Sequence, residues 1–583
     1  MRGFARDPHK IEWQRAAHGC MRVVCFAVSR TNANLVGMLF CVALATACAL
    51  NGIIGMAAGK IPAGNVLVGL PHVDLLVYYA CARETYDEHT LLRYATPYTS
   101  DSNSPRIYSQ FAFLLMGLVW QVAKLSILHT DQLLRACFGG LTLFMGALVL
   151  RRALPVGERN KPVGIAGSLL IMVGGGLAWA AASWNLVWDW AIAQREPADN
   201  TTFANWVGGW PDFFARAESG YGEWGASPVR VLFSVPECIY HVLFFGCVLA
   251  LLVGQRWMAI ALLALTWWSH PFTGMLLGSI VVVYLGICLR TERRVTLPLA
   301  CAIAIQVFFV MLYALYLPHF REHASVVQQM SAFSATMLFS KMLNAYGVFL
   351  VLPLLCLPRW RRVVEDNQRV VALMATWLVC NVLLLFSDRF MAMPLQPMHF
   401  SRGYLYVPLV YFSVRGLEHW AGMKQVKWQL GCAAGLMLVH LPDSVVFARQ
   451  FSEGLKTLGP EFSISKDAAA TMRALDRIGD TLTIHVLPSA RLAGVEGVLP
   501  VLTHHRALMG HSFNTPFVAR KRELAAALDS NVTANLPVPE HVNALVVGVS
   551  DFEKLGTVDL PLSNPLQLAE GRYLVHVPSD GRY

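Results

Sequence analysis

The sequence predicts a polytopic α-helical membrane protein with a small extracytoplasmic α/β domain at its C-terminal end. Three observations lead to this fold class. The chain of 583 residues is 55% apolar and only 14% charged, whereas soluble domains carry about 25% charged residues. Apolar runs of about 20 residues, the length of a membrane-spanning helix, recur along most of the chain. Basic residues gather in short segments between these runs, as the positive-inside rule expects of cytoplasmic loops.

The N-terminal segment, residues 1–32, carries six basic residues and is predicted to be cytoplasmic. The apolar run Leu35–Ala58 follows it. This run is too long for the apolar core of a signal peptide, and no small-residue cleavage site follows it. We therefore expect a retained first span.

Residues 33–449 form the predicted multi-span body. From residue 162 onward the basic loops alternate without conflict, which places residues 450–583 outside the membrane. The spans of this part are expected near residues 162–190, 230–254, 257–272, 273–290, 296–317, 336–357, 369–387, 403–419 and 428–447.

The number of membrane crossings between Gly59 and Arg151 follows from the predicted sides of these two residues. Gly59 is predicted outside and Arg151 inside, yet two apolar runs, 107–128 and 133–150, lie between them. An odd number of crossings is required. One run is therefore expected to be a juxtamembrane or re-entrant helix at the outer surface, which gives about eleven spans in all.

The C-terminal region, residues 450–583, has the composition of a small α/β domain on the outer face. Its β-branched runs and turn residues predict short strands, and one amphipathic run predicts a helix. The expected strands are Thr481–Pro488, Ala544–Val549 and Arg572–Pro578, and the expected helix is Val518–Ser530.

Composition also excludes several functions. The net charge of +10 is no sign of nucleic-acid binding, because most of the excess lies in short loops where it sets topology. The thirteen cysteines include no CxxC pair and are read as small buried apolar residues. Soluble nucleotide chemistry has no support, since the phosphate-loop and dinucleotide-binding glycine motifs are missing, as is HExxH.

Polar chemistry is expected on the outer side, in the first outer loop 59–107 and in segments 191–229, 318–335 and 388–402. The predicted mid-span positions are nearly free of charge, whereas transporters place polar groups near the midplane. This distribution favours an enzyme.

Asp74 is the first catalytic candidate. It shares one helical face with Tyr78 and Cys81. An acid at the membrane surface beside aromatic residues loses water, which raises its basicity and suits a general base. The alternative interpretation is a helix N-cap, which Asp favours.

Other polar residues allow two interpretations each. Glu84, Asp87, Glu88 and His89 form either an acid or metal site or a solvated helix face. In addition, Ser104 before Pro105 predicts the N-cap of the next helix.

Buried polar groups are expected near the outer ends of later spans. Glu237 and His241 lie one turn apart, and His270 precedes Pro271; such groups are functional or satisfy each other. His319, Arg321, Glu322 and His323 form either a metal site or a charged interfacial helix.

Cations at the outer surface are candidate phosphate ligands. Arg389 and Arg402 lie there with Asp388 and His399, and guanidinium groups bind phosphate through paired hydrogen bonds. The alternative is contact with lipid headgroups. Lys341, near the start of a span, is long enough to reach those headgroups.

Four stretches carry a family likeness. They are VDLLVYYACAR with TPYTSDSNSPRIYSQFAFLLMGLVWQVAKL after it, WWSHPFTG, PMHFSRGYLYVPL, and HHRALMGHSFNTPFVARKREL. Together they resemble the GT-C superfamily, membrane glycosyltransferases that use polyprenyl-phosphate sugars, and in particular its bacterial members. The likeness implies a GT-C-like fold in the bacterial inner membrane and a role in building the cell envelope.

The resemblance implies a role for each candidate. Asp74 would be the general base on the acceptor, with Glu84 and Asp87 as the fallback acids. The cations of the outer surface would hold the lipid phosphate, and the remaining buried groups would line the site. The phosphate-binding set is Arg389, Arg402, His399 and Lys341, and the lining set is Tyr78, Glu237, His241 and His270.

The reaction implied is an inverting transfer from a polyprenyl-phosphate sugar to a hydroxyl of a glycan, lipid or protein acceptor. No metal ligand set is evident, although a divalent cation is compatible with this chemistry. The chain lacks a WWDYG-like motif, which argues against transfer to Asn. Two other functions stay open: a polysaccharide polymerase or ligase with a lipid-diphosphate donor, and a transporter or scaffold.

Overall fold

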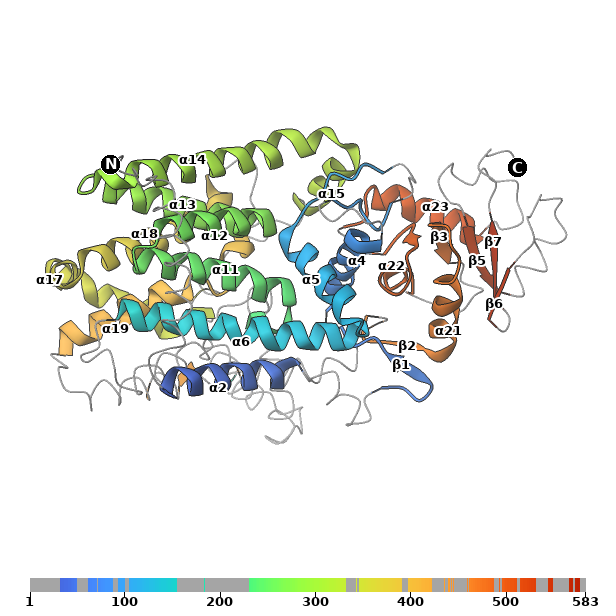
Figure 1. The fold of residues 1–583 in the computed structure, drawn as a ribbon, viewed down its shortest axis with the longest axis horizontal. Helices are drawn as coiled ribbons and strands as arrows, with labels where there is room; N and C mark the ends of the chain where they lie inside the picture. The colour runs from blue at the N-terminus through green and yellow to red at the C-terminus, as the bar shows by residue number, and fades with distance from the viewer. Residues whose placement is uncertain are drawn as a thin grey trace, which may run out of the picture. The chain divides into compact units, whose positions relative to one another are not determined.

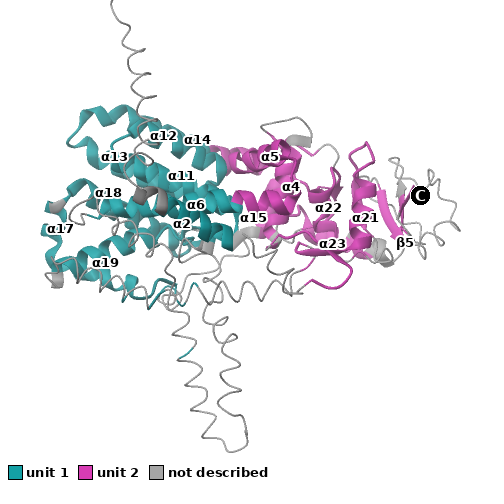
Figure 2. Cartoon of the chain, turned by 60° about the horizontal axis from the view of Figure 1, so that its bottom comes forward, with its two compact units in different colours: residues 1–48, 135–310, 334–450 teal, residues 49–134, 311–333, 451–583 magenta. Residues whose placement is uncertain are grey.

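The computed structural model describes the chain in segments. They are residues 32–49, 61–70, 72–87, 93–99, 104–154, 230–331, 345–390, 397–421, 461–486, 495–510, 514–530, 544–548, 566–569 and 572–576, with single residues at 183, 342, 435, 439, 440, 442, 444, 459 and 492. The chain divides into two compact units (Figure 2). Unit 1 holds residues 1–48, 135–310 and 334–450, and unit 2 holds residues 49–134, 311–333 and 451–583.

Unit 1 is helical (Figure 1). Its longer helices are α2 (Asn32–Ala49), α6 (Ile127–Ala153, which begins in unit 2), α11 (Val235–Leu252), α12 (Arg256–Ser269), α13 (Pro271–Leu289), α14 (Thr296–Met311), α17 (Trp360–Asp366), α18 (Gln368–Leu385) and α19 (Tyr406–Ala421). The short helices of unit 1 are η1 (Arg230–Phe233), η2 (Arg293–Val295), η5 (Gly347–Leu350), η6 (Leu352–Arg359), η7 (Ser387–Arg389) and η8 (Pro397–Phe400).

Five helices in the described residues are long and apolar enough to cross a membrane. They are Ile127–Ala153, Val235–Leu252, Pro271–Leu289, Arg293–His319 and Gln368–Leu385. The length and apolar composition of these helices indicate an integral membrane protein that crosses the bilayer several times. The total of about eleven spans stays a prediction, because much of the expected spans 162–190 and 428–447 lies outside the described residues.

Not every apolar run forms a helix long enough to cross a membrane. The run 107–128 forms α5 (Phe111–Ala123), whose 13 residues cover only about 20 Å of a bilayer core about 30 Å thick. In the run 336–357, the described part from residue 347 consists of the 3₁₀ helices η5 and η6. Pro353 lies at the start of η6 and Pro358 inside it, and each removes a backbone donor that an α-helix needs.

Unit 2 combines helices with a mixed sheet. Its helices are α4 (Val73–Asp87), α5, the π-helical turn η3 (Leu312–Tyr316), η4 (Leu317–His319), α15 (Arg321–Ser331), α21 (Lys466–Leu475), η11 (Val495–Gly497), α22 (Leu499–Leu502) and α23 (Val518–Ser530). Its strands are β1 (Asn65–Leu67), β2 (Ser463–Ser465), β3 (Thr483–Val486), β4 (Arg506–Ala507), β5 (Ala544–Gly548), β6 (Leu566–Ala569) and β7 (Arg572–His576).

The sheet of the C-terminal region has the order β4-β3-β5-β7-β6. Strand β3 pairs in parallel with β4 and β5, while β7 pairs antiparallel with β5 and β6. Helix α21 lies beside β6 (Figure 1). The expected helix and all three expected strands are confirmed as elements, and the helix has the predicted bounds. Strands β4 and β6 and helix α21 were not expected.

Residues 59–107, predicted as the first outer loop, and the C-terminal region belong to the same compact unit. Strand β1 pairs antiparallel with β2, and Val66 lies opposite Ile464. The backbone of Val68 and Gly69 donates to the carbonyl of Phe462, each at 2.9 Å. Helix α4, which carries Asp74, therefore starts directly after a backbone pairing with the C-terminal region.

Candidate functional site

Asp74 lies in the first turn of α4, one of the positions where a helix favours an acid. The residue before the helix, His72, accepts the backbone N–H of Asp74 at its Nδ1 atom, at 3.1 Å. The same Nδ1 lies 3.5 Å from Asp74 Oδ2, and the two side chains are 44% and 23% exposed. The cap of α4 is thus His72, and the Asp74 carboxylate stays partly open to water.

The rest of α4 is held by packing. The Tyr78 ring stacks on Phe113 of α5, with ring centroids 5.4 Å apart, and Cys81 is buried. Gly117 of α5 allows the two helices to approach closely, since a Cβ there would lie 2.5 Å from the carbonyl oxygen of Ala82. Of the face predicted to hold Asp74, Tyr78 and Cys81, the Asp74 end is the more exposed.

Glu84, the first fallback acid, is engaged by an arginine. Arg506 Nε donates to its Oε1 atom at 2.9 Å and Nη2 to its Oε2 atom at 3.4 Å. The side chains of Arg506 and Glu84 are only 6% and 11% exposed. Ten positions along α4 separate Asp74 from Glu84, which corresponds to about 15 Å. The two acids therefore do not lie at one site.

The remaining acids of the first loop are only partly described. Asp87 is the last residue of α4, and its side chain lies outside the described residues, as do Glu88 and His89. Their predicted roles stay predictions.

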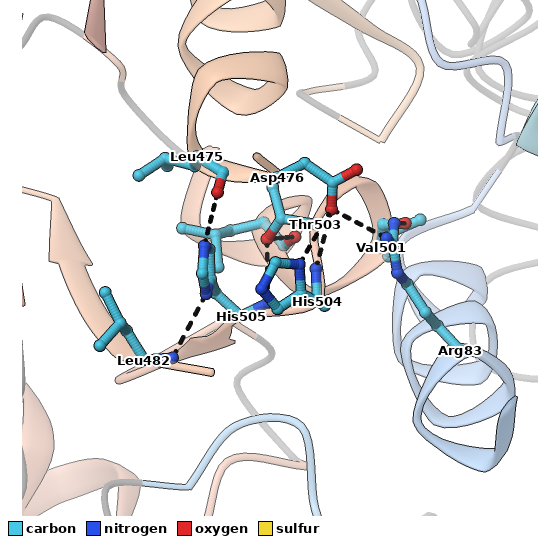
Figure 3. Close-up of polar contacts among 9 residues, drawn as sticks. Arg83, Leu475, Asp476, Leu482, Val501, Thr503, His504 and His505 are labelled. Carbon is cyan, nitrogen blue, oxygen red and sulfur yellow. Dashed lines mark hydrogen bonds and ion pairs between the residues drawn. The ribbon is translucent and has the colours of Figure 1, made fainter. Parts of the chain in front are cut away.

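A second ion pair holds α4 to the C-terminal region (Figure 3). Arg83 donates to Asp476 Oδ1 at 2.9 Å and to the carbonyl of Val501 at 3.1 Å. The same Asp476 oxygen accepts the backbone N–H of His504 at 3.1 Å. Together with the Glu84 pair, these contacts fix the C-terminal half of α4 to the end of α21, to α22 and to β4.

His505, in the same cluster, is a buried neutral imidazole. Its Nε2 donates to the carbonyl of Leu475 at 2.7 Å, and its Nδ1 accepts the N–H of Leu482 at 3.3 Å. Burial lowers the pKa of His505 to about 4. Only a neutral imidazole can donate from one ring nitrogen and accept at the other. His505 therefore has a structural role here, because it joins Leu475 to Leu482.

Glu322 of α15 binds two residues that lie between α4 and α5 in the sequence. Its two carboxylate oxygens accept from the hydroxyls of Thr99 and Ser104, at 2.5 and 2.6 Å. The expectation that Ser104 caps the next helix is wrong, because α5 begins only at Phe111 and the Ser104 hydroxyl is used by Glu322. Lys521 donates to the carbonyl of Tyr98 at 2.8 Å, and burial lowers its pKa to about 8.

Unit 1 contains a separate polar core. Arg402 forms an ion pair with Glu237, and each side chain is only 5% exposed. His241 lies with Nε2 2.6 Å from the carbonyl of Arg402 and with Nδ1 2.7 Å from that of Glu237. Its ring stacks on Tyr404 at 4.2 Å. These contacts join α11 to the turn before α19.

His270 and His399 extend this core. His270 caps α13 by accepting the N–H of Thr273 at 3.3 Å, and its ring lies 5.4 Å from that of His399. The Thr273 hydroxyl lies 3.1 Å from that of Tyr404. Burial, with the charge of Arg402, lowers the pKa of His399 well below its usual range. The sequence singled out five of these groups, Glu237, His241, His270, His399 and Arg402, and the structure brings them together.

Arg389 differs from Arg402 in its surroundings. It ends η7, its side chain is exposed, and its guanidinium lies 5.6 Å from the ring centre of Phe386. Lys341 lies outside the described residues. In the described segments, no three His, Cys, Asp or Glu side chains gather closely enough to hold a metal ion.

Several groups of this region were missed from the sequence. His72, Arg506 and Tyr404 each contact a predicted site residue. The His-x-Asp spacing of His72 and Asp74 is a local signal that could have found the first. The other contacts join segments far apart in the sequence and leave no local signal.

Comparison with known proteins gives a likeness in fold only. No protein-family model matches the chain, and no curated protein has a similar sequence. Among solved structures, the apo form of the Archaeoglobus fulgidus oligosaccharyltransferase matches 89% of this chain and 71% of that chain, with 12% identity and a TM-score of 0.41. Archaeal oligosaccharyltransferase AglB from Archaeoglobus fulgidus, in complex with an inhibitory peptide and a dolichol-phosphate, matches 92% and 71%, with 14% identity and a TM-score of 0.40. These values assign no residue a role.

Proposed function

We propose that this protein is a membrane glycosyltransferase that moves a sugar from a polyprenyl-phosphate donor to an acceptor hydroxyl outside the cytoplasm. Three features support the proposal. The described residues include five helices long and apolar enough to cross a membrane, and a lipid-borne donor needs such a body. Its polar candidates gather in two groups, at α4 and around Arg402, and the second group includes Glu237 and His241 in the first two turns of α11. Its sequence stretches resemble those of the GT-C superfamily.

The observation that carries the proposal is the state of the Asp74 carboxylate. It is 23% exposed in the first turn of a helix, so an acceptor hydroxyl can reach it. Glu84 and Glu237 are buried against arginines. A general base must contact the proton that it removes. Among these three acids, Asp74 meets this condition best.

The proposed reaction is a single displacement. The Asp74 carboxylate takes the proton of the acceptor hydroxyl while its oxygen attacks the anomeric carbon. The new oxygen–carbon bond forms as the bond from that carbon to the phosphate oxygen breaks. The lipid phosphate leaves with the electron pair. Attack opposite the leaving group inverts the anomeric configuration.

Arg389 is the first candidate for the departing phosphate. Its guanidinium is exposed, and a cation placed where negative charge develops lowers the barrier. Arg402 forms an ion pair with Glu237. The negative charge of Glu237 offsets the attraction of Arg402 for a phosphate. The predicted roles of Arg402, His399 and Lys341 in binding the donor phosphate stay predictions.

The test is a transfer assay on the purified protein in lipid. Radiolabelled polyprenyl-phosphate and polyprenyl-diphosphate sugars are offered with acceptors from a bacterial envelope. Transfer from the monophosphate donor, with an inverted anomeric centre in the product, would support the proposal. Turnover of the diphosphate donor alone would favour a polymerase or ligase. An absence of sugar transfer from both donors would contradict the proposal that the protein is a glycosyltransferase.

A further inference from the structure

Four aromatic side chains of unit 2, here called the aromatic row, lie in contact one after another, starting on the helix that carries Asp74. Tyr78 of α4 stacks on Phe113 of α5, and Phe113 meets the ring of Tyr94 edge-on, with centroids 6.0 Å apart. Tyr94 in turn stacks on Tyr108 at 5.7 Å. The two inner rings, Phe113 and Tyr94, are buried, whereas Tyr78 and Tyr108 are only half-buried. Each partly exposed ring is therefore backed by a buried one.

The Tyr108 end of the aromatic row is held in place by the backbone. Tyr94 and Tyr108 form an antiparallel bridge, in which each residue donates its N–H to the carbonyl of the other, at 2.9 and 3.3 Å. Glu322 joins the same two stretches farther along, because it accepts from both Thr99 and Ser104. The rings are thus positioned before a ligand arrives, and a preorganised site loses little entropy on binding.

His323 of α15 adds a further ring beside Tyr108, with centroids 5.7 Å apart. Its side chain is half-buried, and burial lowers the pKa of His323 to about 4. The imidazole is therefore neutral at neutral pH. This end of the aromatic row offers uncharged rings and no cationic ring that would attract a phosphate.

We propose that the aromatic row binds the sugar rings of a glycan acceptor, with Tyr78 and Tyr108 as the rings that stack on it. The inference rests on the proposed function and narrows its acceptor to a carbohydrate chain. Tyr78 follows Asp74 by one helical turn, so about 5–6 Å separates their Cβ atoms. A chain bound along the row ends with a hydroxyl at the Asp74 carboxylate.

Carbohydrate chemistry fits such a surface. A face of a pyranose ring carries C–H groups, whose slight positive charge is attracted to the negative face of an aromatic ring. The hydroxyls at the edge of the sugar need polar partners. Tyr108 is flanked in the sequence by the half-buried side chains of Arg106 and Gln110, which can supply them. A lipid tail has no hydroxyls for such groups to bind.

The experiment measures binding to the full-length protein in lipid, with labelled hexasaccharides of glucose, mannose and N-acetylglucosamine as probes. For at least one probe, we expect Tyr108→Leu to bind about 3- to 10-fold more weakly than wild type, as the loss of one aromatic contact predicts. Tyr108→Phe keeps the ring and should bind as wild type does. Tyr316→Leu is the matched control, since Tyr316 is an exposed tyrosine that pairs with Phe320 outside the row; it should not change the affinity.

The transfer assay separates the acceptor site from the chemistry. With the bound hexasaccharide as acceptor, Tyr108→Leu should raise the KM for the acceptor by the same factor and leave kcat unchanged. With glycerol as acceptor, which is too small to reach along the row, wild type and variant should react equally. If thermal unfolding shows that Tyr108→Leu does not fold, Tyr78→Leu tests the other end of the row with the same expectations.

Two contrary results have different meanings. Equal affinity of wild type and the Leu variants for every hexasaccharide, or no binding to wild type, would overturn the inference and leave the rings as packing or as anchors at the lipid interface. Binding that depends on these rings, without sugar transfer from either donor, would overturn the proposed function and keep the row as a carbohydrate-binding site.

Discussion

The polar core of unit 1 and the start of α4 in unit 2 hold charged groups in opposite ways. In the core, Glu237 and Arg402 are almost fully buried and neutralise each other. At the start of α4, Asp74 is partly exposed beside an exposed histidine. A buried charge depends on its partner for stability, whereas a partly exposed one can contact a substrate. Substitutions in the core should therefore lower stability, and substitutions at Asp74 should lower the rate.

The largest loss of stability is expected from Glu237→Gln. It leaves the Arg402 guanidinium buried without its counter-charge, which costs about 3–5 kcal/mol in the free energy of unfolding. Thermal unfolding in detergent measures this loss. The double variant Glu237→Gln/Arg402→Met removes both charges and should recover most of it. Equal losses in the single and double variants would show that the pair is not coupled.

Acid should weaken unit 2 through His505. Its pKa is about 4 in the folded chain and about 6.5 when unfolded. Between these values the unfolded chain binds the extra proton, so stability falls as pH drops from 6.5 to 4. At pH 5 the contribution of His505 is a loss of about 2 kcal/mol. His505→Gln should flatten the pH dependence of the unfolding midpoint, and an unchanged slope would contradict the role.

The close contact of α4 with α5 gives a smaller effect. Gly117→Ala places a methyl group 2.5 Å from the carbonyl oxygen of Ala82, and such overpacking costs about 1–3 kcal/mol. Gly286→Ala in α13 is the control, because a Cβ there meets nothing within 4 Å. It should leave the unfolding midpoint unchanged or raise it slightly. Equal effects would show that the α4–α5 contact is looser than described.

The smallest change in stability is expected at Arg389. Its side chain is exposed, so Arg389→Ala should change the free energy of unfolding by no more than about 0.5 kcal/mol. The KM for the lipid-phosphate donor should nevertheless rise. Arg389→Lys keeps the charge without the paired hydrogen bonds and should lie between wild type and Ala. An unchanged KM for the donor in Arg389→Ala would show that Arg389 does not bind the donor phosphate.

Local patterns in the sequence predicted local structure well. The helix Val518–Ser530 was expected with the bounds that it has, because its apolar spacing and flanking residues are all in one stretch. Strand β4 was missed, since its two residues, Arg506 and Ala507, are too few to show an alternating pattern. The 3₁₀ helices near Pro353 and Pro358 could not be predicted from hydropathy, which does not register the backbone donors that these prolines lack.

The partners of the polar residues could not be predicted. Glu84 and Arg506 are 422 positions apart in the sequence, and Glu237 and Arg402 are 165 apart. No local pattern shows which cation each acid meets. Ser104 shows the same limit, because Glu322, 218 positions away, takes the hydroxyl that a helix cap would have used. The sequence identified candidate groups, and the fold decides which are paired.

The central claim is that Asp74 is the base and that Glu84 is structural. The most direct test measures transfer rate and unfolding midpoint side by side for Asp74→Asn and Glu84→Gln. We predict that Asp74→Asn lowers the rate about 10²- to 10⁴-fold, as the loss of a general base does, with its midpoint unchanged. Glu84→Gln should lower the midpoint and keep most of the rate of the folded protein. The reverse pattern, with Asp74→Asn active and Glu84→Gln folded but inactive, would contradict the claim.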